Sequence, residues 1–432
     1  MPIYETAPSL ILPTHSNARA GEESDLIDAE IVPSRDPLCA TTLEHEAACE
    51  LATGYAPEGT FVGRPRRGWL RRVGRWLRVA IASTWNLASL IGLLAFVAAI
   101  PVVQLIALGY MLQAAGRLAR GEPWHRSLPG LRLAGRVTAF GLWATLFWLP
   151  VWLATDVSYS VQLLRPDSFQ ASAWRIGASL IASAWVVWVA WAAMRGGRAR
   201  HFLWPQPVRF AVRIWRPSTW SRAADDLWEL TGRLHLVSLW WLGLRAAIGA
   251  LIWIAIPVSM MIIGLRADEL NVAGLVGLIG ALSLTWVMLH LPLLQTRLAE
   301  SNRMAEMFNV REVRRRFRYA PWAITISLTM LLALCIPLWL LRIEATPEQL
   351  TWLPSLFFVG LMFPGKLAIG AALGYANRRP LPRHWSLRWS ARVFCGVAAL
   401  SYVGTLYIAQ FVAWQGIYVM YFQHAVLVPV AN

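Results

Sequence analysis

The sequence predicts an all-α, polytopic transmembrane helix bundle with about seven to eight spans. Stretches of roughly twenty uncharged, Trp-rich residues alternate with Arg-rich clusters from about residue 79 onward. The composition agrees, since 57% of the 432 residues are hydrophobic and only 15% are charged, against about 25% in soluble domains. Backbone polar groups cannot stay unpaired in lipid, and alternating ten-residue strands are not apparent, so we expect the spans to be helices.

Eight apolar stretches are long enough to cross about 30 Å of hydrocarbon at about 1.5 Å per residue. They are 83–108, 137–155, 176–194, 246–264, 272–294, 323–341, 352–375 and 394–413. We expect seven full crossings and one ambiguous segment, the first.

Two segments precede these spans. Residues 1–60 hold eleven acidic residues against two arginines and show no sustained periodicity, which predicts a disordered acidic tail. A short apolar cluster around Ile31 is a candidate docking motif for a protein partner. Residues 61–78 combine seven arginines with apolar residues at three- and four-residue spacing, which predicts a basic amphipathic helix on the membrane surface. Residues 79–432 then form the transmembrane helical domain.

The arginines predict the orientation of the chain. Five clusters hold 32 of the 40 basic residues, and the connections between them carry few arginines and some acids. The clusters are Arg64–Arg78, Arg117–Arg136, Arg195–Arg233, Arg297–Arg318 and Arg378–Arg392. We therefore expect a multi-pass protein of the bacterial inner membrane with these clusters and the N-terminal tail on the cytoplasmic side. The net charge of +16 then faces the lipid bilayer and its anionic headgroups rather than nucleic acid.

The apolar stretch 79–116 leaves two interpretations open. It is 38 residues long with Pro101 near its middle, and both clusters that flank it are predicted to be cytoplasmic. A re-entrant hairpin that turns at Pro101, with arms of about 15 to 20 residues, returns the chain to its own side. A single tilted span would move one basic cluster outward. The charge distribution favours the hairpin.

A two-helix repeat is predicted in 96–155 and 358–413. Ala-Leu-Gly-Tyr occurs at 107–110 and again at 372–375, each time after Phe-Val and a proline, and a Pro, His, Ser, Leu order follows both copies. If the duplication is real, the equivalent helices should run in the same direction, as in parallel repeats of other membrane bundles. Chance similarity in so biased a composition is the alternative.

Basic side chains inside apolar stretches are costly, and they mark the candidate residues for binding a substrate or a lipid. Lys366, the only lysine, follows Pro364 in an apolar stretch. One interpretation is that it binds an anionic substrate or a lipid headgroup. The alternative is structural, in which its side chain snorkels to the interface or pairs with a carbonyl. Arg245 borders an apolar run and is interpreted as an interface residue. His290 either relays protons or is a hydrogen-bonded structural histidine.

His125 and His384 complete the candidates, because they occupy matching positions in the two copies of the repeat. The spans contain no paired aspartates, no His-Glu-x-x-His pattern, no Gly-x-Ser-x-Gly elbow and no phosphate-binding loop. The four cysteines show neither zinc-type spacing nor a disulfide framework. We therefore expect no catalytic residue, no metal ligand and no cofactor.

One local segment resembles a broad group of bacterial membrane proteins of unknown function. That group has a similar progression of Pro, Gly-Tyr, Arg, Gly and Pro after an apolar helix. The residues that carry the resemblance here are Pro101, Gly109, Tyr110, Arg117, Arg120, Gly121, Pro123 and Pro129. It implies a polytopic bacterial membrane protein and supplies no activity or catalytic residue.

Three functional classes follow. The preferred one is a non-enzymatic membrane scaffold or lipid-organising protein, because segments such as Trp215–Leu234 and Phe308–Trp322 combine arginines with aromatic residues. The alternative is a permease or channel-like carrier for a neutral or anionic solute, with Lys366 in the pathway. The lack of intramembrane carboxylates argues against proton or sodium coupling. The third class is an enzyme that uses His125 and His384.

Overall fold

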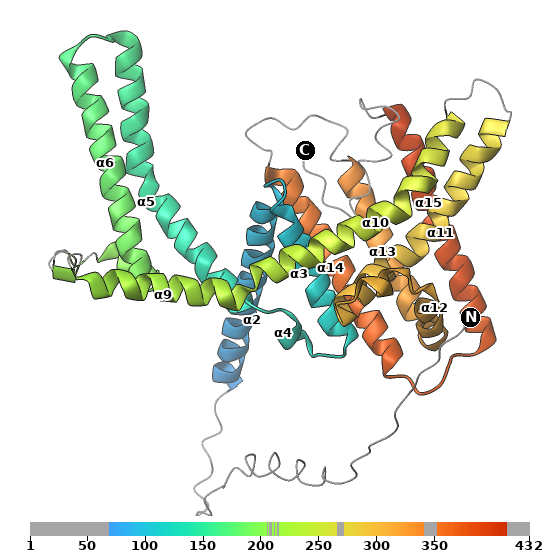
Figure 1. Ribbon diagram of the computed structural model, residues 1–432. Coiled ribbons are helices and arrows are strands. Elements are labelled where there is room, and N and C mark those ends of the chain that lie inside the picture. The colour runs from blue at the N-terminus through green and yellow to red at the C-terminus, as the bar shows by residue number, and fades with distance from the viewer. Residues whose placement is uncertain are drawn as a thin grey trace, which may run out of the picture. The chain divides into compact units, whose positions relative to one another are not determined.

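The computed structural model of the chain describes residues 69–412, without 205, 207–209, 211, 214–215, 266–271 and 341–351. This described part is helical and contains no strand (Figure 1). Eight of its helices are long and apolar enough to cross a membrane. The predicted all-α transmembrane bundle is thereby confirmed, and the chain is a multi-pass integral membrane protein. The predicted acidic tail, 1–60, lies outside the described residues, as does 61–68 of the predicted surface helix.

The long helices cover the predicted apolar stretches and extend beyond most of them. They are α2 (Trp69–Ala98), α5 (Leu131–Leu164), α6 (Phe169–Met194), α10 (Leu236–Leu265), α11 (Val272–Ser301), α13 (Pro321–Leu340), α14 (Trp352–Asn377) and α15 (Trp385–Val412). The shorter helices are α3 (Gln104–Ala119), α4 (Trp124–Ser127), α7 (Ala199–Leu203), α9 (Pro217–Leu234), the 3-10 helix η1 (Met304–Phe308) and α12 (Val310–Tyr319). Contacts group the chain into Met1–Gly74 and Arg75–Asn432, and every helix after α2 belongs to the second unit.

The stretch 79–116 forms a helix, a turn and a second helix, as the hairpin interpretation requires. α2 ends at Ala98 and α3 begins at Gln104, with Pro101 in the turn and Val102 at a φ of 68°. The predicted span 83–108 is therefore not one helix, because proline has no N–H to continue the hydrogen-bond ladder. The two arms are unequal, with 30 and 16 residues.

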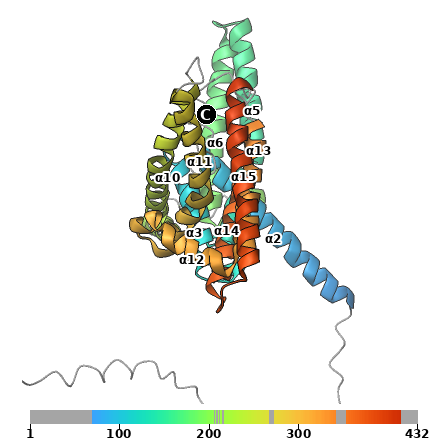
Figure 2. The ribbon, with the colours of Figure 1, turned by 90° about the vertical axis from the view of Figure 1, so that its right-hand side faces the viewer.

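The shorter arm, α3, forms part of the centre of the bundle. Nearly every side chain from Ala107 to Ala119 is buried, and α3 packs against α10, α11 and α14 (Figure 2). α13 packs against α14 and α15 and extends the bundle. Because its neighbours surround it, α3 does not need the length of a lipid-facing span; sixteen residues reach only about 24 Å.

Glycines let α3 contact its neighbours backbone to backbone. A Cβ at Gly109 would overlap the Leu239 carbonyl of α10, and one at Gly116 would overlap the backbone of α11. Gly374 of α14 lies in the same way against the Leu118 carbonyl of α3. Lipid provides no hydrophobic force between helices, so close contact at small residues is a main source of their association.

The antiparallel helices α10 and α11 are also in close contact at glycines. Gly264 of α10 lies against Gly277 of α11 near one end of the pair. Near the other end, the amide of Gln295 donates a hydrogen bond of 3.4 Å to the Ala246 carbonyl.

The two Ala-Leu-Gly-Tyr motifs lie on helices that pack together and run in the same direction. Gly370 of α14 lies against Ala115 of α3, and one turn later Gly374 lies against Leu118. In both copies the motif glycine is at a close helix contact: Gly109 of α3 lies against α10, and Gly374 of α14 lies against α3. Parallel packing agrees with the direction that a duplication requires, and the duplication itself stays a prediction.

α5 and α6 form a helical hairpin beside the bundle (Figure 1). The Ser168 hydroxyl accepts the Ala171 N–H and caps the start of α6. Edge-to-face contact between Trp148 and Trp185, with ring centroids 4.7 Å apart, joins the two helices. Most of the hairpin surface is not covered by protein, so in a membrane it contacts lipid.

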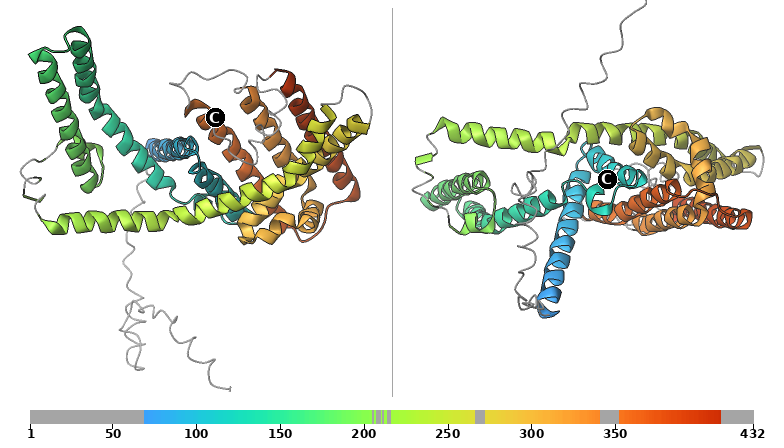
Figure 3. Two further views of the ribbon diagram at one scale, coloured as in Figure 1. Left: turned by 45° about the horizontal axis from the view of Figure 1, so that its top comes forward. Right: turned by 90° about the horizontal axis from the view of Figure 1, so that it is seen from below.

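Two hydrogen bonds attach the first turns of α5 to α2. The Trp85 indole donates to the Gly135 carbonyl at 3.4 Å, and the Thr138 hydroxyl donates to the Ser89 carbonyl at 3.4 Å. After α6 the chain continues through α7 and then along α9. α9 and α10 lie end to end, separated by His235 in the left-handed conformation (Figure 3).

Replacing Gly109 with alanine should destabilise the protein, because the added methyl group would overlap the α10 backbone. We expect a loss of about 1–3 kcal/mol, measured as a lower unfolding midpoint of the full chain in detergent. Gly141→Ala on α5 is the matched control, since nothing lies within 4 Å of that Cβ position and alanine favours helix. A Gly109→Ala variant that melts with the wild type would contradict the role of this contact.

Candidate functional site

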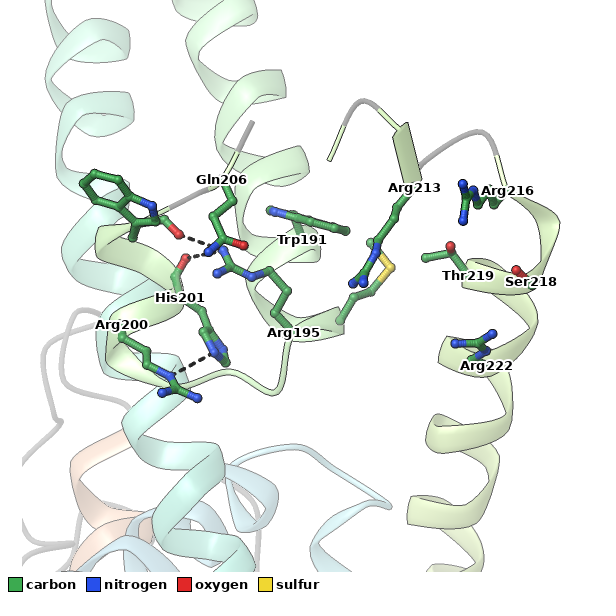
Figure 4. Close-up of a pocket in the computed structure, with 12 residues that line it drawn as sticks. Trp191, Arg195, Arg200, His201, Gln206, Arg213, Arg216, Ser218, Thr219 and Arg222 are labelled. Carbon is green, nitrogen blue, oxygen red and sulfur yellow. Dashed lines mark hydrogen bonds between the residues drawn. The ribbon is translucent and has the colours of Figure 1, made fainter. Parts of the chain in front are cut away.

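A basic pocket of about 770 Å³ lies between the end of α6, α7 and the start of α9 (Figure 4). Among the described residues that line it are five arginines and one histidine, together with aromatic and hydroxyl side chains, and no carboxylate. The lining residues are Trp191, Met194, Arg195, Arg200, His201, Trp204, Gln206, Arg213, Arg216, Ser218, Thr219 and Arg222. None of the five candidates predicted from the sequence is among them.

One wall of the pocket is built where α6 stops. Gly196 and Gly197 have φ angles of 96° and 63°, and these left-handed conformations turn the chain sharply into α7. The Arg195 guanidinium reaches across the turn and donates to the Trp204 carbonyl at 2.8 Å, and it lies over the Trp191 ring at 5.9 Å. Arg195 therefore fixes the shape of this wall.

His201 contributes no positive charge to the pocket at neutral pH. Burial lowers its pKa, and the positive charges of Arg195, Arg200 and Arg198 lower it further. The Arg200 Nε donates to His201 Nε2 at 3.3 Å, which a protonated ring nitrogen could not accept. The charge of the pocket therefore comes from its arginines.

The opposite wall carries Arg216 and Arg222, with Ser218 and Thr219 at the start of α9, and Arg213 lies between the two walls (Figure 4). The side chains of these three arginines are exposed. Within the described ranges they take part in no hydrogen bond, ion pair or ring contact. Three guanidinium groups that face a cavity without a counter-charge can bind an anion, preferably phosphate or carboxylate through paired N–H donors.

Lys366 is buried in the bundle core rather than in this pocket. Its side chain on α14 is 1% exposed, and its Nζ donates to Gln295 Oε1 of α11 at 2.6 Å. Because the Gln295 amide nitrogen faces Ala246, its oxygen is oriented towards Lys366. The remaining two N–H donors of the ammonium have no hydrogen-bond acceptor in the described part of the chain. Lys366 therefore does not snorkel to the surface; it pairs with the side-chain carbonyl oxygen of Gln295.

Arg245 and His290 have local partners. Arg245 donates to both the carbonyl and the side-chain oxygen of Asn302 at the end of α11, and it lies over the Trp241 ring at 5.9 Å. His290 Nδ1 donates to the Trp286 carbonyl one turn earlier, at 2.8 Å, and its ring packs on the Trp286 indole. Both residues therefore have hydrogen-bond partners within the bundle, and their roles stay predictions.

The two repeat histidines do not form a joint site. His125 is exposed on α4. His384 accepts the Ser386 N–H and contacts its hydroxyl at 2.9 Å, at the start of α15. No hydrogen bond or ring contact joins the two imidazoles within the described residues, so nothing positions them for shared chemistry.

The sequence did not predict an ion-pair network centred on Glu300, near the end of α11. Its carboxylate accepts two hydrogen bonds from Arg316 of α12, at 2.8 and 3.0 Å, and one from Arg297 at 2.9 Å. Arg120 donates to its carbonyl at 3.0 Å, and Asn377 contacts its carboxylate at 3.5 Å. The network joins α3, α11, α12 and α14, and only its arginine content was visible in the sequence.

Glu312 extends this network along α12. Burial alone would raise its pKa, but hydrogen bonds and positive charge from Arg315 and Arg316 lower it below the ordinary value. Since the pKa of Glu312 is lower in the folded protein than in the unfolded chain, its ionised carboxylate stabilises the fold fully above the ordinary carboxyl pKa. It is lost as the pH falls through the lower, folded value.

No protein-family model matches the sequence, and no curated protein or solved structure matches it. Function is therefore inferred from the chemistry of the sites themselves.

Replacing Arg316 with methionine should leave the Glu300 carboxylate without its two-point partner in a mostly buried position. Removing one member of such a pair costs about 3 kcal/mol or more, seen as a lower unfolding midpoint in detergent. Arg315→Met on the same helix is the control, because the Arg315 side chain is 62% exposed against 9% for Arg316 and exposed pairs contribute under about 1 kcal/mol. Equal losses in the two variants would show that the network is not a stabilising element.

Proposed function

We propose that the protein is a non-enzymatic, lipid-organising membrane protein that holds anionic lipid headgroups in its basic pocket. One observation carries the proposal: the described residues that line a cavity at the end of the apolar helix α6 include five arginines and no carboxylate. Guanidinium groups at the rim of a span meet headgroup phosphates, and each basic residue near an anionic surface contributes about 1 kcal/mol.

The composition of the pocket supports binding rather than catalysis. Arg195 is engaged by the local backbone and His201 is kept neutral by its arginine neighbours. The hydroxyls of Ser218 and Thr219 have no imidazole or carboxylate beside them among the lining residues, and an acyl- or phosphoryl-transfer site would need an activating base. The pocket can orient and hold a phosphate group.

We further propose that the Arg-rich helix ends face the cytoplasm of a bacterial inner membrane. Three of the five clusters are associated at one end of the bundle: Arg378 donates to the Gly121 carbonyl, and the Arg383 N–H donates to the Arg318 carbonyl. Arg245, at the start of α10, bonds Asn302 at the same end. Basic residues concentrated on one side of the spans are typical of a cytoplasmic face.

Replacing Arg213, Arg216 and Arg222 together with glutamine should remove headgroup binding. Losing three favourable contacts of about 1 kcal/mol each predicts at least a tenfold weaker retention of phosphatidylglycerol. Retention would be measured by native mass spectrometry of the full chain released from mixed phosphatidylcholine and phosphatidylglycerol nanodiscs.

The control for this experiment is Arg126→Gln, Arg383→Gln and Arg392→Gln in one chain. These side chains are also exposed, and they lie outside the pocket, so the change in net charge is the same. The control should retain phosphatidylglycerol as the wild type does. If both triple variants lose the lipid equally, the binding comes from diffuse surface charge and the pocket has no special role.

Lys366 favours a second function, a carrier for a neutral or anionic solute. The described residues of α3, α10, α13, α14 and α15 contain no carboxylate, and Glu300 of α11 is bound to arginines. A buried ammonium with two unused donors and no counter-ion would attract an anion that enters the bundle.

Lys366→Met tests this second function in proteoliposomes. If Lys366 lies in a solute pathway, the variant should conduct labelled chloride or glycerol at least about tenfold more slowly than the wild type. Arg245→Gln, which changes a basic residue bound to Asn302 near the helix ends, should conduct as the wild type does. Wild-type protein that conducts neither probe faster than empty liposomes would remove the carrier function.

A further inference from the structure

We propose that the basic pocket takes a lipid headgroup with two phosphate groups, such as a diphosphatidyl lipid or a lipid diphosphate, in preference to a headgroup with one. This inference rests on the proposed function, since it specifies the ligand of the same pocket. Three observations support it: the number of positive charges, their distribution on two walls and the size of the cavity.

The positive charges exceed what one phosphodiester can balance. Arg195, Arg200, Arg213, Arg216 and Arg222 all line the cavity, and no carboxylate is found among its other lining residues in the described part of the chain. Arginines that face each other across a cavity repel unless a ligand brings opposite charge. A single phosphodiester brings one negative charge, whereas two phosphate groups bring at least two, so the second class of headgroup leaves fewer guanidinium groups uncompensated.

The charges are also divided between two walls. Figure 4 shows Arg195 and Arg200 on the side of α6 and α7, and Arg216 and Arg222 on the side of α9, with Arg213 between them. An arginine binds phosphate best through two parallel N–H donors, which fixes the guanidinium close to the phosphate oxygens. One phosphate therefore forms paired hydrogen bonds with the arginines of one wall, and a second phosphate is needed to bind the arginines of the other wall.

The size of the cavity agrees with this arrangement. Its volume of about 770 Å³ lies within the range of about 300–1,000 Å³ that holds an extended small molecule, and a lone phosphate would leave most of it empty. Trp191, Met194 and Trp204 add apolar surface beside the arginines. Aromatic rings at the end of a span lie at the depth where a headgroup joins its hydrocarbon chains, which favours a membrane lipid over a soluble phosphate.

The test compares lipids with one and two phosphate groups in the full-length protein. Nanodiscs of phosphatidylcholine would contain the same small fraction of phosphatidylglycerol, phosphatidic acid, cardiolipin or a polyprenyl diphosphate, and native mass spectrometry would give the lipid retained. We expect the wild type to bind the two-phosphate lipids at least about tenfold tighter than the one-phosphate lipids. Arg213→Gln, Arg216→Gln and Arg222→Gln together should reduce that ratio towards one, and the triple variant at Arg126, Arg383 and Arg392 should preserve it.

The outcomes separate this inference from the function on which it rests. Phosphatidylglycerol or phosphatidic acid bound as tightly as both two-phosphate lipids would overturn the inference and leave anionic lipid binding intact. No anionic lipid retained above phosphatidylcholine would overturn both. Inorganic pyrophosphate provides the last comparison. If it binds as tightly as the polyprenyl diphosphate, the proposal that the ligand is a membrane lipid is overturned, whereas weaker binding of pyrophosphate supports that proposal.

Discussion

Hydrocarbon does not tolerate an uncompensated charge, and the rest of this structure depends on that constraint. Nearly all the arginines leave the apolar interior and gather at helix ends, where they must be balanced by carboxylates, carbonyls or ligands. In the bundle the arginines are balanced by groups of the protein itself. The Glu300 carboxylate accepts hydrogen bonds from Arg316 and Arg297, and the Glu300 carbonyl accepts one from Arg120. At α6, α7 and α9 the arginine charges have no such internal partner, since the described residues that line the pocket include no carboxylate. This difference distinguishes a structural network from the pocket that we propose as a binding site.

Much of the fold could be predicted from the sequence, because span length and charge clustering are local properties. The number of spans, their approximate positions and the break at Pro101 followed directly from them. The unequal arms of the first hairpin could not be predicted, because α3 is short only where α10, α11 and α14 replace lipid around it. The exact ends of α5 were also missed: it begins at Leu131 and carries Arg132 and Arg136 in its first turns, since long basic side chains can reach the interface from within a helix.

The candidate site was harder to predict, because a pocket depends on residues that the fold brings together. The cluster Arg195–Arg233 was evident as charge, and the sequence used it only to orient the chain. Which of its arginines face one cavity depends on the turn at Gly196 and Gly197 and on the return of α9. The residues chosen for their rarity in apolar runs proved to have structural partners: His290 bonds Trp286, Arg245 bonds Asn302, and Lys366 bonds Gln295. Rarity identified buried polar groups well, but it did not identify a site that is open to a ligand.

The attachment of the α5 and α6 hairpin has a mechanical consequence. The hairpin is joined to its surroundings near its base, through Trp85 and Thr138, and its remaining surface is left to the acyl chains. One wall of the pocket follows α6, while the other follows α9, which lies end to end with α10 of the bundle. A change in the tilt of the hairpin would therefore change the gap between the guanidinium groups, and bilayer thickness and lateral pressure would act on the pocket in this way.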